Sequence, residues 1–407
     1  MGECIYRFIA SAVSRHCTDG IGASLRPLQL GVGTKGGAET IIHGLRNYAN
    51  RNPEHVVLAM DISNAFNSIS RTAVYQGITS HASNLSLFFL WAYGKPSPLW
   101  IPEGANTPIT TVMSIQGVRQ GDPLGPLFFC LGIHPTLSLH RQNSEAKIVA
   151  YADDLHVFGS PTAVASLAKS LSTSLSTILL HVSPSKFRAF SHLHRSPLEM
   201  QESSTVQISN DGMQLLGGAI GSNQFQQHFA TQALSKARGF FKTVLETEGI
   251  PVQHKHILMR VCGLGRVTYL ARCMPHTVFN QAVQVTGGPL HLYFYSLFSI
   301  GHENIGDIDE RICTLPHCKG WTGWLDCTEI APLAFLASCV MAQKNLQGLG
   351  TCQPWMEDYP PERSLVSMFQ KAKETSKDLA DPMDLLRFNK PQKRLSEDYC
   401  RRRGGVW

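Results

Sequence analysis

The sequence contains no uninterrupted apolar run of the roughly 18 residues that a membrane-spanning helix needs. Its first residues, MGECIYRFIASAVSRHC, lack the signal-peptide order of charged segment, apolar block and cleavage site. They also lack the Ser or Thr at the sixth position that completes a myristoylation signal. We therefore expect an intracellular chain with no membrane partner, whose 11 cysteines are reduced thiols rather than disulfides.

Paired metal-binding knuckles are also missing. Cys313, His317, Cys318 and Cys327 cluster in the sequence, but without two CxxC or HxxxH pairs. Structural zinc sites usually show such pairs, so helix-capping and core roles are favoured and metal binding is left open. The three glycines of GVGTKG match a dinucleotide-binding pattern, yet Pro27 interrupts any strand before them and no second βαβ unit follows. A nicotinamide enzyme is therefore disfavoured.

Charge is sparse, at 16% of the 407 residues, whereas 43% are hydrophobic. A chain of this length and composition can form two or more packed cores. The net charge of +6 fits a polyanionic partner without establishing one.

Two segments place carboxylates at the ends of predicted strands. The run Val56–Met60 is typical of a strand buried on both faces; it ends at Asp61, and a helix begins near Asn64. KIVAYADDLHVFG indicates strand, two-residue turn and strand, with Asp153 and Asp154 in the turn. The simplest interpretation of the tetrapeptide alone is that Asp is a good turn residue.

The rest of the chain divides into a mixed region and a helical region. A helix is predicted from Ser166 to Leu180, and MQLLGGAIGS offers a short strand with a Gly-Gly break. Helical spacing then predominates to about residue 345, with HILMRVCGLGRVTYLARCM as a second helix and LHLYFYSLFSI as a third. The polar, basic residues that follow favour a solvated tail, with nucleic-acid contact as the alternative.

Carboxylates gathered at the ends of adjacent central strands would repel one another unless cations lay between them. Hard oxygen ligands suit Mg²⁺, which binds a few carboxylates, waters and substrate phosphates. Two such ions about 3.5–4 Å apart can activate an attacking hydroxyl and stabilise leaving pyrophosphate. The chemistry indicated is nucleotidyl transfer.

Several segments now match a known family. AMDISNAFNSISR, GVRQGDPLGPLFF and YADDL resemble motifs A, B and C of reverse transcriptases. LQLGVGTKGGAETIIHGLR upstream, with LLGGAIGS and APLAFLAS downstream, resembles the non-LTR (LINE-type) retrotransposon branch, over about residues 1 to 345. In that family the initial Gly-Glu normally follows a basic fingers segment, so the resemblance implies an N-terminally truncated hand. The order of the motifs outweighs the interpretation of the two aspartates as simple turn residues.

The fold implied by the resemblance is α+β, a right-hand polymerase with partial fingers, a ferredoxin-like palm and a helical thumb. Its regions would be residues 1–55 (fingers), 56–222 (palm with primer grip), 223–345 (thumb) and 346–407 (polar, basic tail).

The resemblance also implies roles for particular residues. Asp61 and Asp153 would bind two Mg²⁺ ions, for which Mn²⁺ can substitute, with Asp154 completing the acidic pair and the Ile62 carbonyl assisting. Lys186, in SPSKF, lies near the family's lysine proposed to protonate pyrophosphate; a solvated surface lysine is the alternative.

Substrate contacts are implied as well. Phe66 stands where the family places an aromatic ring beneath the incoming sugar, against a ribose 2′-OH, with core packing as the alternative. Ala65 belongs to the same nucleotide site. Gln120 and Gly121 would line the nascent base pair, Gly121 because a side chain would block close approach. The primer grip would include Leu216, Gly217 and Gly218.

Two functions from different classes follow. The first is an RNA-directed DNA polymerase that uses an RNA template, a DNA primer, dNTPs and Mg²⁺. The second is a truncated retroelement fragment that binds nucleic acid without effective catalysis, and template-independent addition is a third reading of the same acids. The resemblance alone implies that the protein acts in the nucleus. It also suggests a separate endonuclease or other retroelement chain as a partner.

Overall fold

The computed structural model describes residues 4–101, 110–201, 204–288, 290, 292–297 and 327–347. The chain divides into two compact units. The first unit comprises Met1–Ile41 and Tyr48–Asn210, and the second comprises Ile42–Asn47 and Asp211–Trp407. Helix α2 (Gly37–Arg51) therefore contributes residues to both. The contacts within the chain thus place one division between Asn210 and Asp211. The boundaries given above for fingers, palm and thumb stay a prediction.

The first unit is built around a five-stranded sheet in the order β11-β8-β1-β6-β5. Smaller two-stranded sheets pair β2 with β7, β3 with β4, and β9 with β10. The strands are β1 (Val56–Met60), β2 (Ile62–Ser63), β3 (Ser97–Ile101), β4 (Thr110–Ser114), β5 (Lys147–Tyr151), β6 (Asp154–Gly159), β7 (His181–Val182), β8 (Arg188–Phe190), β9 (Leu198–Gln201), β10 (Ser204–Val206) and β11 (Ile208–Ser209).

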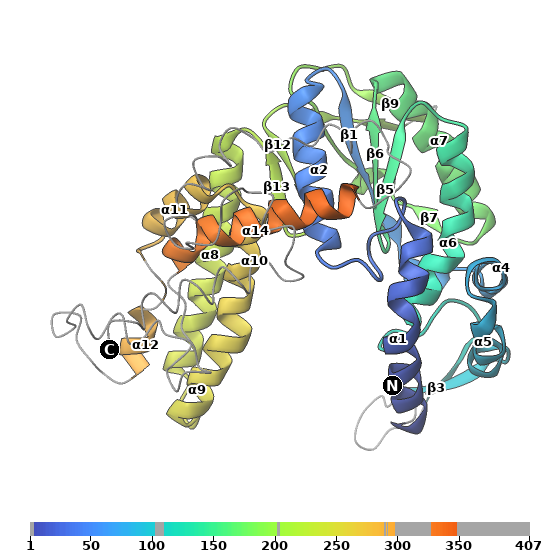
Figure 1. Cartoon of the computed structure of the whole chain (residues 1–407), viewed down its shortest axis with the longest axis horizontal. Helices are drawn as coiled ribbons and strands as arrows, with labels where there is room; N and C mark the ends of the chain where they lie inside the picture. The colour runs from blue at the N-terminus through green and yellow to red at the C-terminus, as the bar shows by residue number, and fades with distance from the viewer. Residues whose placement is uncertain are drawn as a thin grey trace. The chain divides into compact units, whose positions relative to one another are not determined.

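Helices pack against this sheet, and α6 and α7 lie side by side along it (Figure 1). Their apolar side chains share one core with the buried faces of the central strands. The helices are α1 (Cys4–Leu25), α3 (Ala65–Ser68), α4 (Arg71–His81), α5 (Ser86–Tyr93), α6 (Gly125–Gln142) and α7 (Pro161–Thr177), with short 3₁₀ turns η1 (Ser83–Leu85) and η2 (Pro184–Lys186).

The central strands match the sequence pattern closely. β1 spans the predicted run Val56–Met60 and is buried at every position except Ala59. The hairpin turn differs by one residue, because Ala152 and Asp153 form it and Asp154 already pairs with Tyr151 as the first residue of β6. α7 begins at Pro161, earlier than predicted, because proline fits the first turn of a helix.

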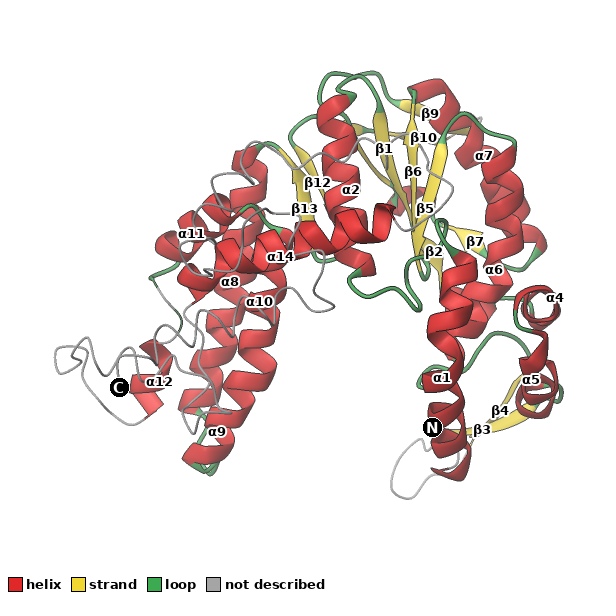
Figure 2. Cartoon of the chain, viewed as in Figure 1, coloured by secondary structure: helices red, strands yellow, loops and turns green. Residues whose placement is uncertain are grey.

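The second unit is mainly helical, and among its described residues the β12–β13 hairpin provides the strands (Figure 2). Phe241, Phe279 and Leu234 lie at the centre of its separate core. Its elements are β12 (Gly212–Leu215), β13 (Gly218–Gly221), α8 (Asn223–Glu246), α9 (Val252–Leu258), the π-helical segment η3 (Met259–Gly263), α10 (Leu264–Cys273), α11 (His276–Val285), α12 (Leu292–Leu297) and α14 (Cys327–Gln347).

The helical predictions need two corrections here. The second predicted helix is interrupted by η3, where a Cβ at Gly263 would come within 2.6 Å of the Phe241 ring, so close packing accompanies the change of pitch. Helix α11 lies between the second and third predicted helices and is absent from the prediction; its N-cap is Pro275, which ends the preceding helical pattern.

Other sequence interpretations fall partly outside the described residues. Cys313, His317, Cys318 and the polar tail lie there, whereas Cys327 is buried in α14. The GVGTKG segment follows a single parallel bridge at Gln29 rather than a strand of a βαβ unit. Within the described part of the chain, no helix is long and apolar enough to cross a membrane.

Candidate active site

The register of the sheet brings the three predicted aspartates to one end of neighbouring strands. β1 and β6 are antiparallel, and Met60 pairs with Leu155. Asp61 directly follows β1 and Asp154 begins β6, so these two residues lie at the same end of the paired strands. Asp153 stands in the turn just before them. Acidic residues 92 and 93 positions apart in sequence, Asp61 with Asp153 and Asp154, are thereby brought to one end of the sheet; we call these three residues the acidic cluster.

The surroundings of Asp153 and Asp154 disfavour the ionised forms of these two carboxyl groups. Burial raises the pKa of Asp153 above its ordinary value, and the negative charge of Asp61 adds to that effect. The pKa of Asp154 is also raised, first by loss of hydration and then by the charges of Asp153 and Asp61. Arg188, at the start of β8, opposes the rise at Asp154. The three acids therefore repel one another in the absence of a counter-charge.

Lys186 supplies one such counter-charge. Its Nζ lies 3.2 Å from Asp61 Oδ2. The backbone favours this approach, because Ser183 N donates to the Asp61 carbonyl at 2.9 Å and η2 then carries Lys186 back over the strand end. Both side chains remain partly open to solvent, Lys186 at 64% and Asp61 at 42%, so the pair contributes little to stability.

The donor set suits a divalent cation. Asp61 Oδ2 is shielded from solvent and accepts no hydrogen bond, so its contact with Lys186 is an ion pair without hydrogen-bond angles. A carboxylate oxygen of this kind is a hard ligand of the type that divalent cations prefer, although the Lys186 ammonium lies 3.2 Å from it here. Among the described side chains, however, no three His, Cys, Asp or Glu lie close enough together to chelate an ion. Ion binding would require the aspartate side chains to converge and Lys186 to leave Asp61.

Ile62 and Phe66 flank this acidic cluster on the chain segment after Asp61. Ile62 is buried in β2, which pairs with β7, and Ala65 is buried at the start of α3. The Phe66 ring stacks on Phe129 with centroids 4.6 Å apart. One ring face is thus fixed by core packing, and Phe66 remains only partly buried.

Gln120 and Gly121 lie on an exposed loop beside a pocket of about 800 Å³. Gly121 has φ +83, and a Cβ there would meet no atom within 4 Å. The backbone angle therefore favours glycine, while the space over it is open to a ligand.

Asp122 anchors the end of that loop, and its role was not predicted from sequence. This buried carboxylate accepts hydrogen bonds from the hydroxyl groups of Tyr6, at 2.6 Å, and Tyr93. Leu124 N donates to its other oxygen at 2.9 Å. Arg119 stacks over the Tyr93 ring, with 4.8 Å between the guanidinium carbon and the ring centroid. No local sequence signal connects Tyr6 with Asp122, because 116 residues separate them.

The predicted primer-grip residues lie at the β12–β13 turn of the second unit, with Leu216 and Gly217 in the turn and Gly218 as the first residue of β13. Leu216 and Gly217 have φ values of +48 and +75. Tyr269 on α10 donates a hydrogen bond of 2.6 Å to the Leu216 carbonyl, and Gly218 is buried. The turn is thereby fastened to the helices of its own unit.

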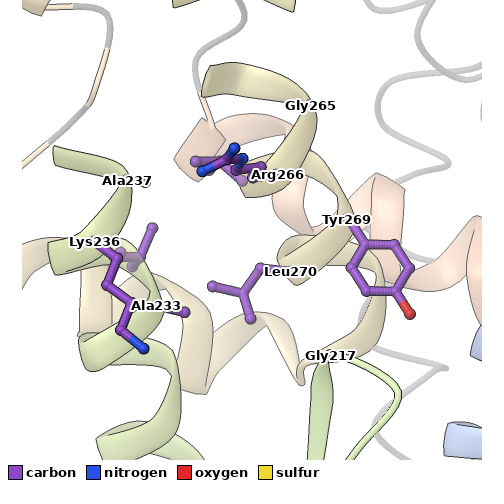
Figure 3. A pocket seen from close by; sticks show the side chains of 10 residues that line it. Gly217, Ala233, Lys236, Ala237, Gly265, Arg266, Tyr269 and Leu270 are labelled. Carbon is purple, nitrogen blue, oxygen red and sulfur yellow. The ribbon is translucent and has the colours of Figure 1, made fainter. Parts of the chain in front are cut away.

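A pocket of about 500 Å³ adjoins this turn within the second unit (Figure 3). Lys236 comes from α8, and Arg266, Tyr269 and Leu270 come from α10. Small residues, Ala233, Ala237, Gly265 and Gly217, form much of the remaining wall. Two exposed cations thus border an otherwise largely apolar hollow.

Part of the sequence matches a known protein family. Residues 2–220 match the model of the family described as reverse transcriptase (RNA-dependent DNA polymerase). The chain belongs to the reverse transcriptase family. Members of that family are nucleotidyltransferases that copy RNA into DNA, and they generally use divalent metal ions. The predicted α+β polymerase fold is confirmed by this match.

One known protein is related in sequence to part of this chain. The retrotransposable element SLACS 132 kDa protein of Trypanosoma brucei gambiense is 34% identical over 105 residues, which are 25% of this chain and 9% of that protein. The chain thus matches only a small part of that relative's length. The predicted assignment to non-LTR retrotransposon reverse transcriptases is confirmed.

Two solved structures are also similar. Telomerase of Candida albicans, in complex with a fragment of telomeric RNA, has 10% identity and a TM-score of 0.31, covering 87% of this chain and 56% of that one. Apo telomerase of Candida tropicalis has 9% identity and a TM-score of 0.33, covering 86% and 59%.

Proposed function

We propose that this chain performs RNA-directed DNA synthesis, with Asp61, Asp153 and Asp154 as the carboxylates of a two-metal centre. The observation that carries the proposal is the position of these three aspartates at one end of the paired strands β1 and β6, with a shielded Asp61 oxygen that accepts no hydrogen bond. Membership of the reverse transcriptase family supports the same reaction. The substrates would be an RNA template, a DNA primer and dNTPs.

Two divalent ions, Mg²⁺ or in its place Mn²⁺, would supply activation of the primer 3′-OH and stabilisation of leaving pyrophosphate. Asp61, Asp153, Asp154 and the Ile62 carbonyl would hold them. The aspartates themselves would present ionised oxygens to the two ions. Their mutual repulsion favours the binding of positive charge between them.

Lys186 would have two successive partners. It neutralises Asp61 in the structure. Once Asp61 binds a divalent ion instead, the Lys186 ammonium group would be free to protonate pyrophosphate. Phe66, held on one face by Phe129, would exclude a ribose 2′-OH with its edge or its other face. Gln120 and Gly121 would contact the nascent base pair from the open loop.

The second unit would hold the primer. In our proposal the turn at Leu216, Gly217 and Gly218 receives the primer's 3′ end, and the adjacent pocket takes part of its sugar–phosphate backbone. Lys236 and Arg266 offer cations for phosphate, and the small wall residues allow close approach. Work in the nucleus and a separate endonuclease chain stay predictions from the resemblance.

The deciding experiment measures dNTP incorporation on an RNA template annealed to a DNA primer, with Mg²⁺ and then Mn²⁺. We expect template-dependent extension that Asp153→Ala abolishes. A folded wild-type chain that binds the duplex but extends no primer would contradict the proposal and support a fragment that only binds nucleic acid. Extension without a template, abolished by the same substitution, would show template-independent addition instead.

A further inference from the structure

A short segment of the first unit runs along the outer edge of β5, beside the turn that carries Asp153. The Leu30 N–H donates to the Ala150 carbonyl at 2.9 Å, and the Ala150 N–H donates to the Leu28 carbonyl at 2.7 Å. Gln29 forms a parallel bridge with Ala150. These bonds extend the sheet by one residue at the edge strand, so the backbone of this segment is in fixed register with the catalytic hairpin.

The side chain of Gln29 continues the same contact toward the aspartate. It is fully buried, and its Nε2 donates to the Ala152 carbonyl at 3.0 Å. Its Oε1 accepts from the Ala152 N–H at 2.7 Å and from the Gly31 N–H at 2.9 Å. One amide group thus engages both backbone polar groups of the residue that immediately precedes Asp153.

Ala152 is a position that needs such support. Its φ of +53 lies in the left-handed region, which residues other than Gly, Asn and Asp adopt rarely. The Gly31 backbone presses against the same residue, since a Cβ at Gly31 would lie 2.4 Å from the Ala152 nitrogen. Contacts from the Leu28–Gly31 segment therefore hold the turn in a conformation that its own sequence does not favour.

We propose that Gln29 is a positioning residue for catalysis, which holds Ala152 and thereby orients the Asp153 carboxylate for cation binding. This inference rests on the proposed polymerase function. Gln29 touches no reacting atom, so its effect passes through the backbone of the turn. A merely structural amide would stabilise the fold without altering how the acidic cluster binds metal.

The test substitutes Gln29→Met, which keeps the approximate volume of the side chain and removes all three hydrogen bonds. We expect the kcat for primer extension to fall at least tenfold, the KM for dNTP to change less than threefold, and the half-saturating Mg²⁺ concentration to rise several-fold. Gln29→Glu, which keeps the two acceptor contacts and sets an oxygen against the Ala152 carbonyl, should show the same pattern if Gln29→Met does not fold.

Asn210→Leu is the matched control. Asn210 also donates to two backbone carbonyls, those of Ser191 at 2.9 Å and His194 at 3.0 Å, but it follows β11 at the opposite edge of the sheet. This variant should lose stability without a change in Mg²⁺ dependence. Equal shifts in the control and the Gln29 variants would overturn the proposal, and so would wild-type Mg²⁺ dependence in the Gln29 variants.

Two readouts do not depend on activity. Hydrogen exchange of peptides that contain Ala152 should be faster in the Gln29 variants, and Mn²⁺ binding measured by electron paramagnetic resonance should be weaker. An inactive wild-type chain would contradict the polymerase function, yet these measurements would still decide whether Gln29 orders the acidic turn. Unchanged exchange and unchanged Mn²⁺ affinity would overturn the inference in either case.

Discussion

At the scale of single residues, the acidic cluster is a place where function opposes stability. The raised pKa of Asp153 means that the folded chain disfavours its ionised form. Between the ordinary value of 3.8 and the higher value in the fold, the folded state binds more protons than the unfolded state. The free energy of unfolding therefore falls as pH rises through that window.

The first prediction follows from this sign. Asp153→Asn should raise the free energy of unfolding at pH 7.5 in the presence of a chelator, and the gain should shrink as pH falls toward 4. Urea unfolding across pH measures it. Asp19→Asn, which removes an exposed carboxylate from α1, is the control. A gain of the same size in both variants, or one that grows on acidification, would contradict the electrostatic account.

Lys186 gives a second prediction, because it competes with cations for Asp61. Lys186→Met should lower the half-saturating Mg²⁺ concentration and, by loss of the proposed proton donor, reduce kcat by about 10²-fold or more. Steady-state extension over a Mg²⁺ series separates the two effects. Lys169→Met on α7 removes another exposed lysine and should change neither. A higher Mg²⁺ requirement in Lys186→Met would argue against competition.

At the scale of elements, hydrogen bonds between distant segments fix the loops that local sequence leaves free. Tyr6 on α1 and Tyr93 on α5 both donate to Asp122, and the pKa of each phenol is raised, so each stays protonated as a donor. The loop with Gln120 and Gly121 is therefore anchored from two helices.

Tyr6→Phe should destabilise the first unit by about 1–3 kcal/mol, because it leaves a buried carboxylate with one donor fewer. Chemical denaturation followed by the loss of helical circular dichroism measures the change. Tyr75→Phe is the matched control, since the Tyr75 ring stacks on Phe89 and its hydroxyl has no hydrogen-bond partner among the described residues. Similar costs in the two variants would show that the Asp122 contact adds nothing.

The β12–β13 turn depends on a positive backbone angle in the same way. Gly217→Ala should cost about 1–2 kcal/mol, because alanine is strained at φ +75 and its Cβ would lie 3.0 Å from the Tyr269 ring. Gly239→Ala on α8, where a Cβ meets nothing within 4 Å, should instead stabilise by about 0.5–1 kcal/mol. Thermal unfolding compares them, and a stabilising Gly217→Ala would disprove the strained turn.

At the scale of the whole molecule, the net charge of +6 is modest, so affinity for nucleic acid must come from where the cations lie. If Lys236 and Arg266 contact primer phosphates, replacing both by alanine should reduce the slope of log affinity against log salt by about 2. Fluorescence anisotropy with an RNA–DNA duplex measures the slope. Lys242→Ala, whose ammonium lies 3.7 Å from Glu246 on the same helix, should leave it nearly unchanged. An equal decrease of this slope in the control would argue against a contact between the pocket and the primer phosphates.

The sequence by itself determined the elements that carry chemistry. The apolar run that ends at Asp61, the hairpin around Asp153 and the order of the family motifs are local patterns, because strand burial and turn chemistry act over a few residues. The interruption at Gly263 was not predicted because it accompanies close packing against Phe241, a residue distant in sequence. Helix α11 was not predicted because its one local signal, Pro275, also fits a simple break between helices.

Only the tertiary structure decided which side chains meet. The pairing of Lys186 with Asp61, of Tyr6 with Asp122 and of Gln29 with Ala152 joins residues 116 to 125 positions apart. Such contacts depend on sheet register and on the packing of helices against the sheet, which no short pattern encodes. Local sequence placed the reacting groups at strand ends, and long-range packing determined their orientation and charge.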